Sequence, residues 1–262
     1  MHIVVCVKQV PNTTQVRINP ETNTLVREGV ESIMNPFDEN ALEMALQLKE
    51  QHAGTKVTVL TMGPPQAAEV LKEAVGRGAD AVVLLSDRAF AGSDTWATSY
   101  ALSMAIRQME KPDLILFGKQ AIDGDTAQVG PGVADWLDLP CIAYARKIEV
   151  ANGVAQVERA YEDGYEKLEV ALPCVLTVLK EANVPRMASL RGKMAAKKLS
   201  IVPLTAEGVG ADPAKLGLNA SPTRVVKIFS PPPKTGGVKW QGEEPAVMAQ
   251  RLADVLRERK LI

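Results

Sequence analysis

The stretch from Gly118 to Gly130 carries the residues best suited to hold a ligand. It directly follows the apolar run Leu114–Phe117, which we expect to be a buried strand. Ligands of open α/β sheets bind at the carboxyl ends of such strands. Asp125 and Gln128 have the spacing of a capping box, which predicts a helix whose free N–H groups at Thr126–Gln128 point outward. Such a helix N-terminus attracts phosphate, and the Thr126 hydroxyl adds a possible donor.

Small and acidic residues in the same loop leave two interpretations open. Gly124 is expected to let the backbone approach a ligand or adopt a positive φ. An ordinary capped loop explains the same residues, and Asp123 and Asp125 suit a phosphate site only if they face a ribose hydroxyl or the backbone. The chain has no GxGxxG, Walker A or SGGxDS-type motif, so the usual dinucleotide-binding and nucleotide-hydrolysing machinery is missing.

The elements that must position this loop alternate in the βαβ manner. Apolar runs without polar alternation predict parallel strands covered on both faces, and proline or Asp/Asn caps predict the helix starts between them. The expected strands are Ile3–Lys8, Lys56–Met62, Ala81–Ser86 and Leu114–Phe117, and the expected helices begin at Asn35-Pro36, Pro64-Pro65 and Ser93-Asp94. The fold class is therefore α/β, a doubly wound, mostly parallel sheet. A small hairpin is expected at Arg17–Val26.

The chain changes character after Pro140. Consecutive strands separated by turn residues predict an antiparallel extension of the sheet, with strands at Cys141–Val150, Val154–Tyr161, Leu168–Leu172 and Val175–Leu179. We expect one α/β domain over residues 1–200 and a C-terminal arm over 201–262, with a proline spacer and a terminal helix at Glu244–Lys260. The arm either closes the domain's own core or reaches a partner.

Composition excludes several classes of protein. Lys+Arg 30 against Asp+Glu 31 gives a net charge of -1, so nothing favours nucleic acid or an anionic membrane surface. The three cysteines, Cys6, Cys141 and Cys174, are far apart and the only histidines are His2 and His52, so no metal-ligand spacing exists. We interpret the cysteines as small buried hydrophobes. The chain lacks a signal-peptide pattern and a run long enough to span a membrane, and a cytoplasmic location is expected.

A basic segment near residue 190 is the second candidate site. Leu190 lies among cations with no acidic residue nearby, the cations being Arg186, Arg191, Lys193, Lys197 and Lys198. An exposed apolar residue ringed by charge suits a transient protein interface. The alternative is a solvated helix face with one packed leucine.

Three separated motifs give the chain a family resemblance. Gly118–Asp123, Asn35–Phe37 and the block Val157–Thr177 closely resemble the β subunit of electron-transfer flavoproteins, and the resemblance runs from Ile3 to about Lys198. It implies an adenine nucleotide α-hydrolase-like fold. It also implies an adenine-nucleotide site formed by Cys6, Asn35, Pro36, Phe37, Asp38, Met62, Gly118, Gln120, Asp123, Gly124, Asp125, Thr126, Ala127, Gln128 and Val129.

Two branches of that family differ in their cofactor. Ordinary members hold AMP structurally, whereas in the electron-bifurcating branch a second FAD replaces AMP and receives electrons from NADH. The run Asp123–Gly130 looks more like the bifurcating branch, since small Gly124 and Ala127 leave room for a pyrophosphate. The sequence offers no acid–base pair or nucleophile in the expected places, which fits a chain whose cofactor does the chemistry.

The resemblance also implies two protein partners. The arm would contact the α subunit of a heterodimer, and Leu190 with Arg186, Arg191 and Lys193 would dock an acyl-CoA dehydrogenase or a similar flavoprotein. Two alternatives remain open at this point. The chain could be an AMP-containing docking subunit that is redox-silent by itself, or a stand-alone adenine-nucleotide-binding protein of the stress-sensor type.

Overall fold

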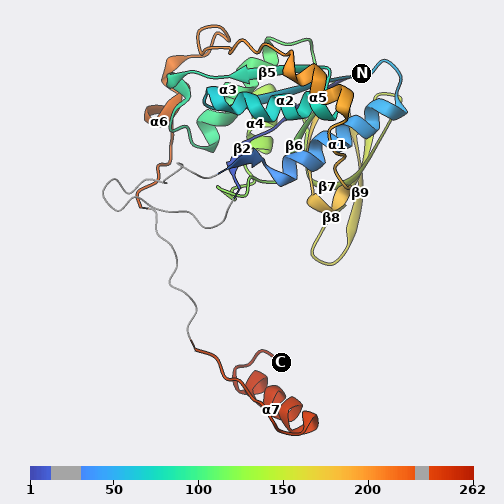
Figure 1. Ribbon diagram of the computed structural model, residues 1–262, viewed down its shortest axis with the longest axis vertical. Helices are drawn as coiled ribbons and strands as arrows, with labels where there is room; N and C mark the ends of the chain where they lie inside the picture. The colour runs from blue at the N-terminus through green and yellow to red at the C-terminus, as the bar shows by residue number, and fades with distance from the viewer. Residues whose placement is uncertain (13–30, 228–235) are drawn as a thin grey trace. The chain divides into compact units, whose positions relative to one another are not determined.

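The computed structural model describes residues 1–12, 31–227 and 236–262 (Figure 1). The chain divides into two compact units, Met1–Ile228 and Phe229–Ile262. The hairpin expected at Arg17–Val26 lies outside the described residues.

An eight-stranded sheet forms the centre of the first unit, with strand order β5-β4-β1-β6-β10-β7-β8-β9. The strands from β5 through β7 run parallel, and β7, β8 and β9 are antiparallel to one another. Their bounds are β1 His2–Cys6, β4 Lys56–Met62, β5 Ala81–Leu85, β6 Leu114–Gly118, β7 Cys141–Ala151, β8 Val154–Ala160, β9 Tyr165–Ala171 and β10 Cys174–Val178. A separate pair, β2 Gln9–Pro11 and β3 Ser32–Met34, is antiparallel.

Helices cover both faces of this sheet, as the sequence predicts. α1 (Pro36–Gln51) and α2 (Ala68–Arg77) pack with Ile3 and Val5 in one apolar cluster. α3 (Thr95–Arg107) and α4 (Val129–Leu137) pack with Val4 and Cys6 in the other. Alternate residues of β1 therefore face opposite helix layers, which is why the strand is continuously apolar. The doubly wound, mostly parallel sheet is confirmed.

The strand order reverses between β1 and β6. After β1 the chain adds β4 and then β5 on one side, and then returns through α3 to place β6 on the other side of β1. Such a reversal splays the loops at the carboxyl ends of the two strands apart and is where open α/β sheets hold ligands. The predicted ligand loop follows β6 and therefore begins at this point.

The antiparallel extension is shorter than predicted. β7, β8 and β9 form it, with Asn152 and Gly153 at φ 52° and 76° in the tight turn, as an Asn-Gly hairpin requires. The expected strand at Val175–Leu179 does not continue the meander. Instead β10 runs between β6 and β7, parallel to both. Its residues are all buried, so its side chains need helix layers on both faces.

The first unit extends beyond the expected boundary at residue 200. Leu204 bridges to Leu85 of β5, and Ala206, Val209 and Leu216 are buried in the cluster with α3 and α4. Residues 204–216 therefore cover one face of the sheet and belong to the α/β unit. The short helices here and elsewhere are η1 Pro65–Ala67, η2 Arg88–Phe90, η3 Lys180–Ala182, α5 Leu190–Lys197, η4 Pro213–Lys215 and α6 Gly217–Ala220.

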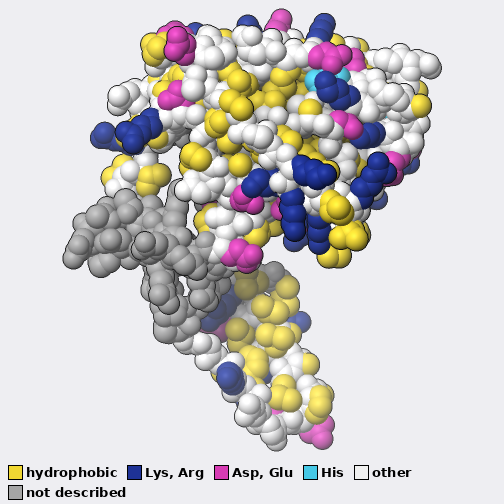
Figure 2. Space-filling view, turned by 45° about the horizontal axis from the view of Figure 1, so that its top comes forward, with side chains coloured by type: hydrophobic (Ala, Val, Ile, Leu, Met, Phe, Trp, Pro, Cys, Tyr) yellow, Lys and Arg dark blue, Asp and Glu magenta, His cyan; other side chains and the backbone are white. Residues whose placement is uncertain are grey.

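The described residues of the second unit contain one helix, α7 (Pro245–Glu258), which confirms the terminal helix predicted at Glu244–Lys260. Proline occupies its first turn, where the missing N–H costs nothing. None of its residues is buried, and apolar side chains lie uncovered along it (Figure 2). Over the residues that the structure describes, no helix is both long and apolar enough to cross a bilayer. The cytoplasmic location stays a prediction.

Candidate ligand site and docking segment

The ends of three neighbouring strands bring the predicted ligand residues together. Cys6 ends β1, Met62 ends β4 and Gly118 ends β6, and β1 pairs with both of the others. The loop after β1 and the N-terminus of α1, with Asn35, lie at the same edge, because the backbone N–H of Asn35 donates to the carbonyl of Lys8. Residues widely separated in sequence thus lie at one edge of the sheet.

Asp38, in the first turn of α1, connects the loop after β1 to the end of β6. Its buried carboxylate accepts the backbone N–H of Lys8 at 2.7 Å and that of Gly118 at 3.1 Å. The loops after β1 and β6 are therefore fixed by one side chain. Burial raises the pKa of Asp38 to about 7, although hydrogen bonds from Asn35, Lys8 and Gly118 oppose that rise. Burial and the charge of Asp38 also raise the pKa of the Cys6 thiol, so Cys6 is a buried neutral thiol.

Glycine is the one residue type that fits at position 118, at the end of β6. A Cβ added there would overlap Asp38 Oδ1 and lie 2.5 Å from the carbonyl carbon of Phe37. No real Cβ tolerates backbone at that distance. Glycine is therefore required for the strand to meet the N-terminus of α1, with Pro36 and Phe37 held against it.

Asn35 holds the ligand loop itself. Its side-chain amide donates to the carbonyl of Gln120 at 2.8 Å, and its Oδ1 accepts the N–H of Ile122 at 3.1 Å. Asn35 precedes α1 as predicted, but its side chain makes no capping hydrogen bond. The sequence thus located the helix start correctly, while the amide performs a different task.

Lys8 is a part of this site that the sequence reasoning missed. Its ammonium lies 2.7 Å from Asp123 Oδ1 and 2.8 Å from Oδ2. The pair neutralises one of the two acids that argue against a phosphate site in this loop. Asp125, the other acid, accepts a hydrogen bond from the Gln120 side chain. Its position could have indicated this role, because Lys8 follows the carboxyl end of the first strand, two residues after Cys6.

The predicted capping box at Asp125–Gln128 is wrong. α4 begins at Val129, after Gln128, which makes no side-chain capping bond. Asp125 and Ala127 adopt φ 53° each, whereas Gly124 does not adopt a positive φ. Gly130 and Gly132 approach Thr177 of β10 and Ser99 of α3 so closely that a Cβ at either would lie under 3 Å from its neighbour. This packing positions the first turns of α4 against β10 and α3, and Thr126 and its neighbours remain in the loop before it.

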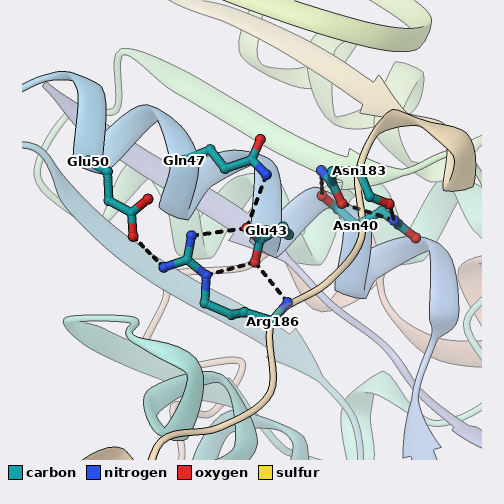
Figure 3. Close-up of polar contacts among 6 residues, drawn as sticks. All are labelled: Asn40, Glu43, Gln47, Glu50, Asn183 and Arg186. Atoms are coloured by element: carbon teal, nitrogen blue, oxygen red, sulfur yellow. Dashed lines mark hydrogen bonds and ion pairs between the residues drawn. The ribbon is translucent and has the colours of Figure 1, made fainter.

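The basic segment presents apolar side chains to solvent. α5 begins after Ser189, whose hydroxyl accepts the Gly192 N–H at 3.0 Å. Leu190 is 78% exposed and Met187 is 88% exposed, so the interpretation of a packed leucine does not hold. Arg191 and Lys193 are exposed beside them. Arg186 differs from these cations, because its guanidinium contacts Glu43 and Glu50 of α1 (Figure 3).

The fold and the candidate site define a class of protein: a doubly wound α/β protein with a loop held by side-chain hydrogen bonds at its topological switch point and a separate exposed basic–apolar segment. The Electron transfer flavoprotein domain profile matches residues 22–208. The chain belongs to the electron-transfer flavoprotein family, as a β subunit, which confirms the resemblance seen in its motifs.

Two of three similar proteins match the chain over its whole length. It is 51% identical over 262 residues to the "Caffeyl-CoA reductase-Etf complex subunit CarD" of Acetobacterium woodii, with 100% of both chains covered. It is 47% identical over 270 residues to the "Electron transfer flavoprotein subunit beta" of Megasphaera elsdenii, again with 100% of both covered. It is also 48% identical over 239 residues to "Protein FixA" of Azorhizobium caulinodans, covering 88% of this chain and 85% of the relative.

Proposed function

We propose that this chain is the β subunit of a heterodimeric electron-transfer flavoprotein that holds FAD at the loop from Gly118 to Val129. It accepts electrons from NADH and passes them through a flavin of the α subunit to a partner dehydrogenase by electron bifurcation. One observation carries this proposal: the loop is fixed at the topological switch point by Asp38 and Asn35. Similarity to a subunit named for a caffeyl-CoA reductase-Etf complex supports the bifurcating branch.

The residues around the loop fit a bound nucleotide. Asn35 and Asp38 hold the backbone in place, so binding would cost little ordering of the loop. Lys8 offsets the charge of Asp123 near the expected phosphates. FAD, when bound, supplies the redox chemistry, and the chain's own groups bind and orient it. Cys6 is buried with a raised pKa and is unsuited to thiolate chemistry.

FAD is favoured over AMP because the loop has small residues where the phosphates are expected. A Cβ added at Gly124 would meet nothing within 4 Å, so the backbone there is open on its outer side. Ala127 is likewise small, and together they leave room for a pyrophosphate. The alternative is an ordinary β subunit that binds AMP structurally and docks acyl-CoA dehydrogenases, in which case the same space would hold one phosphate.

Ligand content separates these functions. The chain would be co-expressed with its α subunit, the ligands released by denaturation, and FAD and AMP quantified per heterodimer. About two FAD and no AMP supports the bifurcating subunit. One FAD with one AMP supports the ordinary subunit, and a flavin-free homodimer would identify a stand-alone adenine-nucleotide-binding protein.

A matched pair of variants tests whether FAD binds at this loop. Gly124→Asp adds a carboxylate where the ligand is expected, and should lower FAD content selectively. Ala53→Asp adds the same group at an exposed residue after α1, far along the chain from the loop. Equal FAD content in the two variants would mean that the ligand lies elsewhere.

Two protein contacts belong to the same proposal. Leu190 and Met187, with Arg191 and Lys193 beside them, form a surface suited to a transient partner such as an acyl-CoA dehydrogenase or a similar flavoprotein. The uncovered apolar side of α7 suits a permanent contact with the α subunit. Leu190→Ala should raise the KM for the acceptor without changing assembly with the α subunit.

A further inference from the structure

The segment that carries Leu190 is held to α1 by polar contacts. Asn40, Glu43, Gln47 and Glu50 lie along one side of the helix, at spacings of three, four and three residues, and therefore share a face. Asn183 and Arg186 have the same spacing of three as Asn40 and Glu43. Figure 3 shows these six residues, which we call the α1 clamp, meeting between helix and segment.

The amide pair fixes the start of the segment. Asn40 Nδ2 donates to the carbonyl of Asn183 at 2.8 Å, and Asn183 Nδ2 donates back to the carbonyl of Asn40 at 3.0 Å. Asn40 is buried, so these bonds are shielded from water. The chain therefore enters the docking segment in a defined direction.

The ion pair fixes the segment three residues later. Arg186 Nε and Nη2 donate to the two oxygens of Glu43 at 2.8 Å and 2.9 Å, a bidentate arrangement. The backbone N–H of Arg186 donates to the same carboxylate at 3.0 Å, and Gln47 donates to it at 3.1 Å. Nη1 of Arg186 reaches Glu50 at 2.5 Å.

Glu43 depends on Arg186 for its charge. Its side chain is only 6% exposed. Burial raises the pKa of Glu43, but the hydrogen bonds and charge of Arg186 outweigh it and hold the pKa below its ordinary value. If Arg186 turned outward to a partner, it would leave a nearly buried carboxylate uncompensated, which is strongly unfavourable. Arg186 is thus committed to the chain itself.

A second contact holds the other end of the segment. A Cβ at Gly192 of α5 would overlap the carbonyl oxygen of Gly76 in α2, and the Ser189 N–H donates to that same carbonyl at 3.2 Å. α2 is in turn linked to α1 by Arg77, whose guanidinium lies 2.7 Å from Glu39. Met187 and Leu190 lie within this stretch, which is attached at Arg186, Ser189 and Gly192, and both are exposed.

We propose that Arg186 is a positioning residue for partner docking, which holds the Met187–Leu190 surface in place through Glu43 and does not itself touch the partner. This rests on the proposed docking function of that surface. Arg191 and Lys193, by contrast, are free to meet an acidic partner surface and steer its approach. Two cations five residues apart, Arg186 and Arg191, thus have different tasks.

The deciding variant is Glu43→Gln, because it keeps Arg186 and its charge but removes the carboxylate that holds it. The heterodimer with its cofactors would be compared with Arg186→Gln, Arg191→Gln and Leu190→Ala. Hydrogen–deuterium exchange of residues 187–198, without acceptor, should rise on the order of tenfold in Glu43→Gln and Arg186→Gln and stay unchanged in the other two. An unchanged exchange rate in both clamp variants would overturn the proposal.

Electron transfer to an acyl-CoA dehydrogenase, used as the probe acceptor, supplies the second measurement. Glu43→Gln and Arg186→Gln should each raise its KM on the order of tenfold, and the double variant no further, since both break one interaction. A raised KM in Arg186→Gln alone would make Arg186 a contact residue and refute the positioning role. Raised exchange with an unchanged KM would show that holding the segment does not serve docking.

Folding and the proposed function have separate controls. Glu50 is exposed, so Glu50→Gln tests the clamp in the same direction if Glu43→Gln fails to fold. If the wild-type protein does not reduce the dehydrogenase, or if Leu190→Ala leaves KM unchanged, the proposed docking function fails. Hydrogen–deuterium exchange of residues 187–198 then still shows whether the α1 clamp holds the segment.

Discussion

At the scale of single residues, the candidate ligand site is shaped by side chains that hydrogen-bond to the backbone of its loops. Asp38 accepts two backbone N–H groups from different loops, and Asn35 satisfies a carbonyl and an N–H of the ligand loop. Gly118 provides the space in which they meet. These side chains hold the loop by its backbone, and the proposed ligand would bind to the part of the loop that they leave uncovered.

The Gly118→Ala variant should be strongly destabilised. Its Cβ would collide with the backbone at Phe37, so we expect a loss of about 2–4 kcal/mol in the free energy of unfolding. Gly124→Ala should be close to neutral, because a Cβ there meets nothing and its φ is not positive. Chemical denaturation of the two heterodimers measures the difference. Similar stability in both would contradict the close approach at the end of β6.

Asp38 should give the protein a distinctive pH dependence. Its folded pKa of about 7 lies above the ordinary value of 3.8, so between these pH values the folded state binds more protons than the unfolded state. Stability therefore falls as pH rises through this window, by at most about 1.4 kcal/mol per pH unit from one group. Above pH 7 the contribution is lost.

The matched variant for this test is Asp38→Asn, which cannot titrate. The stability of the wild-type protein relative to Asp38→Asn should decline from about pH 4 to about pH 7 and then level off. Urea unfolding at a series of pH values measures it. A difference that grows with pH would show that the two backbone donors outweigh burial and that the folded pKa is depressed.

At the scale of elements, α1 links the two candidate sites. Its first turn carries Asp38 at the ligand loop, and its middle carries Glu43 at the docking segment. α5 completes the arrangement by packing on α2 through Gly192 and Gly76. Helices of ordinary length thus set the distance between the proposed ligand site and the proposed docking surface.

Replacing Gly192 by alanine tests this packing, because a tightly packed α5 and a free helix predict opposite changes in hydrogen–deuterium exchange. Alanine in a free helix interior would stabilise by about 1 kcal/mol. In this chain the new Cβ would overlap the Gly76 carbonyl, so we expect α5 to be displaced and exchange of residues 187–198 to increase. Ala195→Ser, at an exposed position of the same helix, should leave exchange unchanged. Slower exchange in Gly192→Ala would mean that α5 does not pack this tightly.

At the scale of the whole molecule, the division into two units differs from the division expected at residue 200. Val209 and Leu216 are buried in the α/β core and Leu204 packs against it, whereas α7 has no buried residue. The core of the first unit therefore includes residues beyond 200, whereas the described residues of the second unit provide no covering layer for the apolar side of α7.

Two truncations distinguish these boundaries. A chain of residues 1–235 should retain the unfolding midpoint of the first unit but assemble poorly with the α subunit. A chain of residues 1–200 should lose several kcal/mol, because burying a single leucine contributes about 2 kcal/mol. Thermal unfolding and size-exclusion chromatography with the α subunit measure both effects. Normal assembly of the shorter deletion would refute the proposed role of α7.

The sequence by itself determined the layered α/β fold and the place of the candidate ligand loop after β6, at the carboxyl end of a parallel strand. Both follow from local signals, the apolar runs and the helix starts between them, whereas the exposure of Leu190 was left open by those signals and decided by the structure. Only the tertiary structure decided that β10 returns between β6 and β7, that α4 starts at Val129, and that Asp38, Lys8 and Arg186 find their partners. Those pairings join residues 80, 115 and 143 positions apart. Periodicity reports which way a side chain faces along its own element, but not which distant element packs against it.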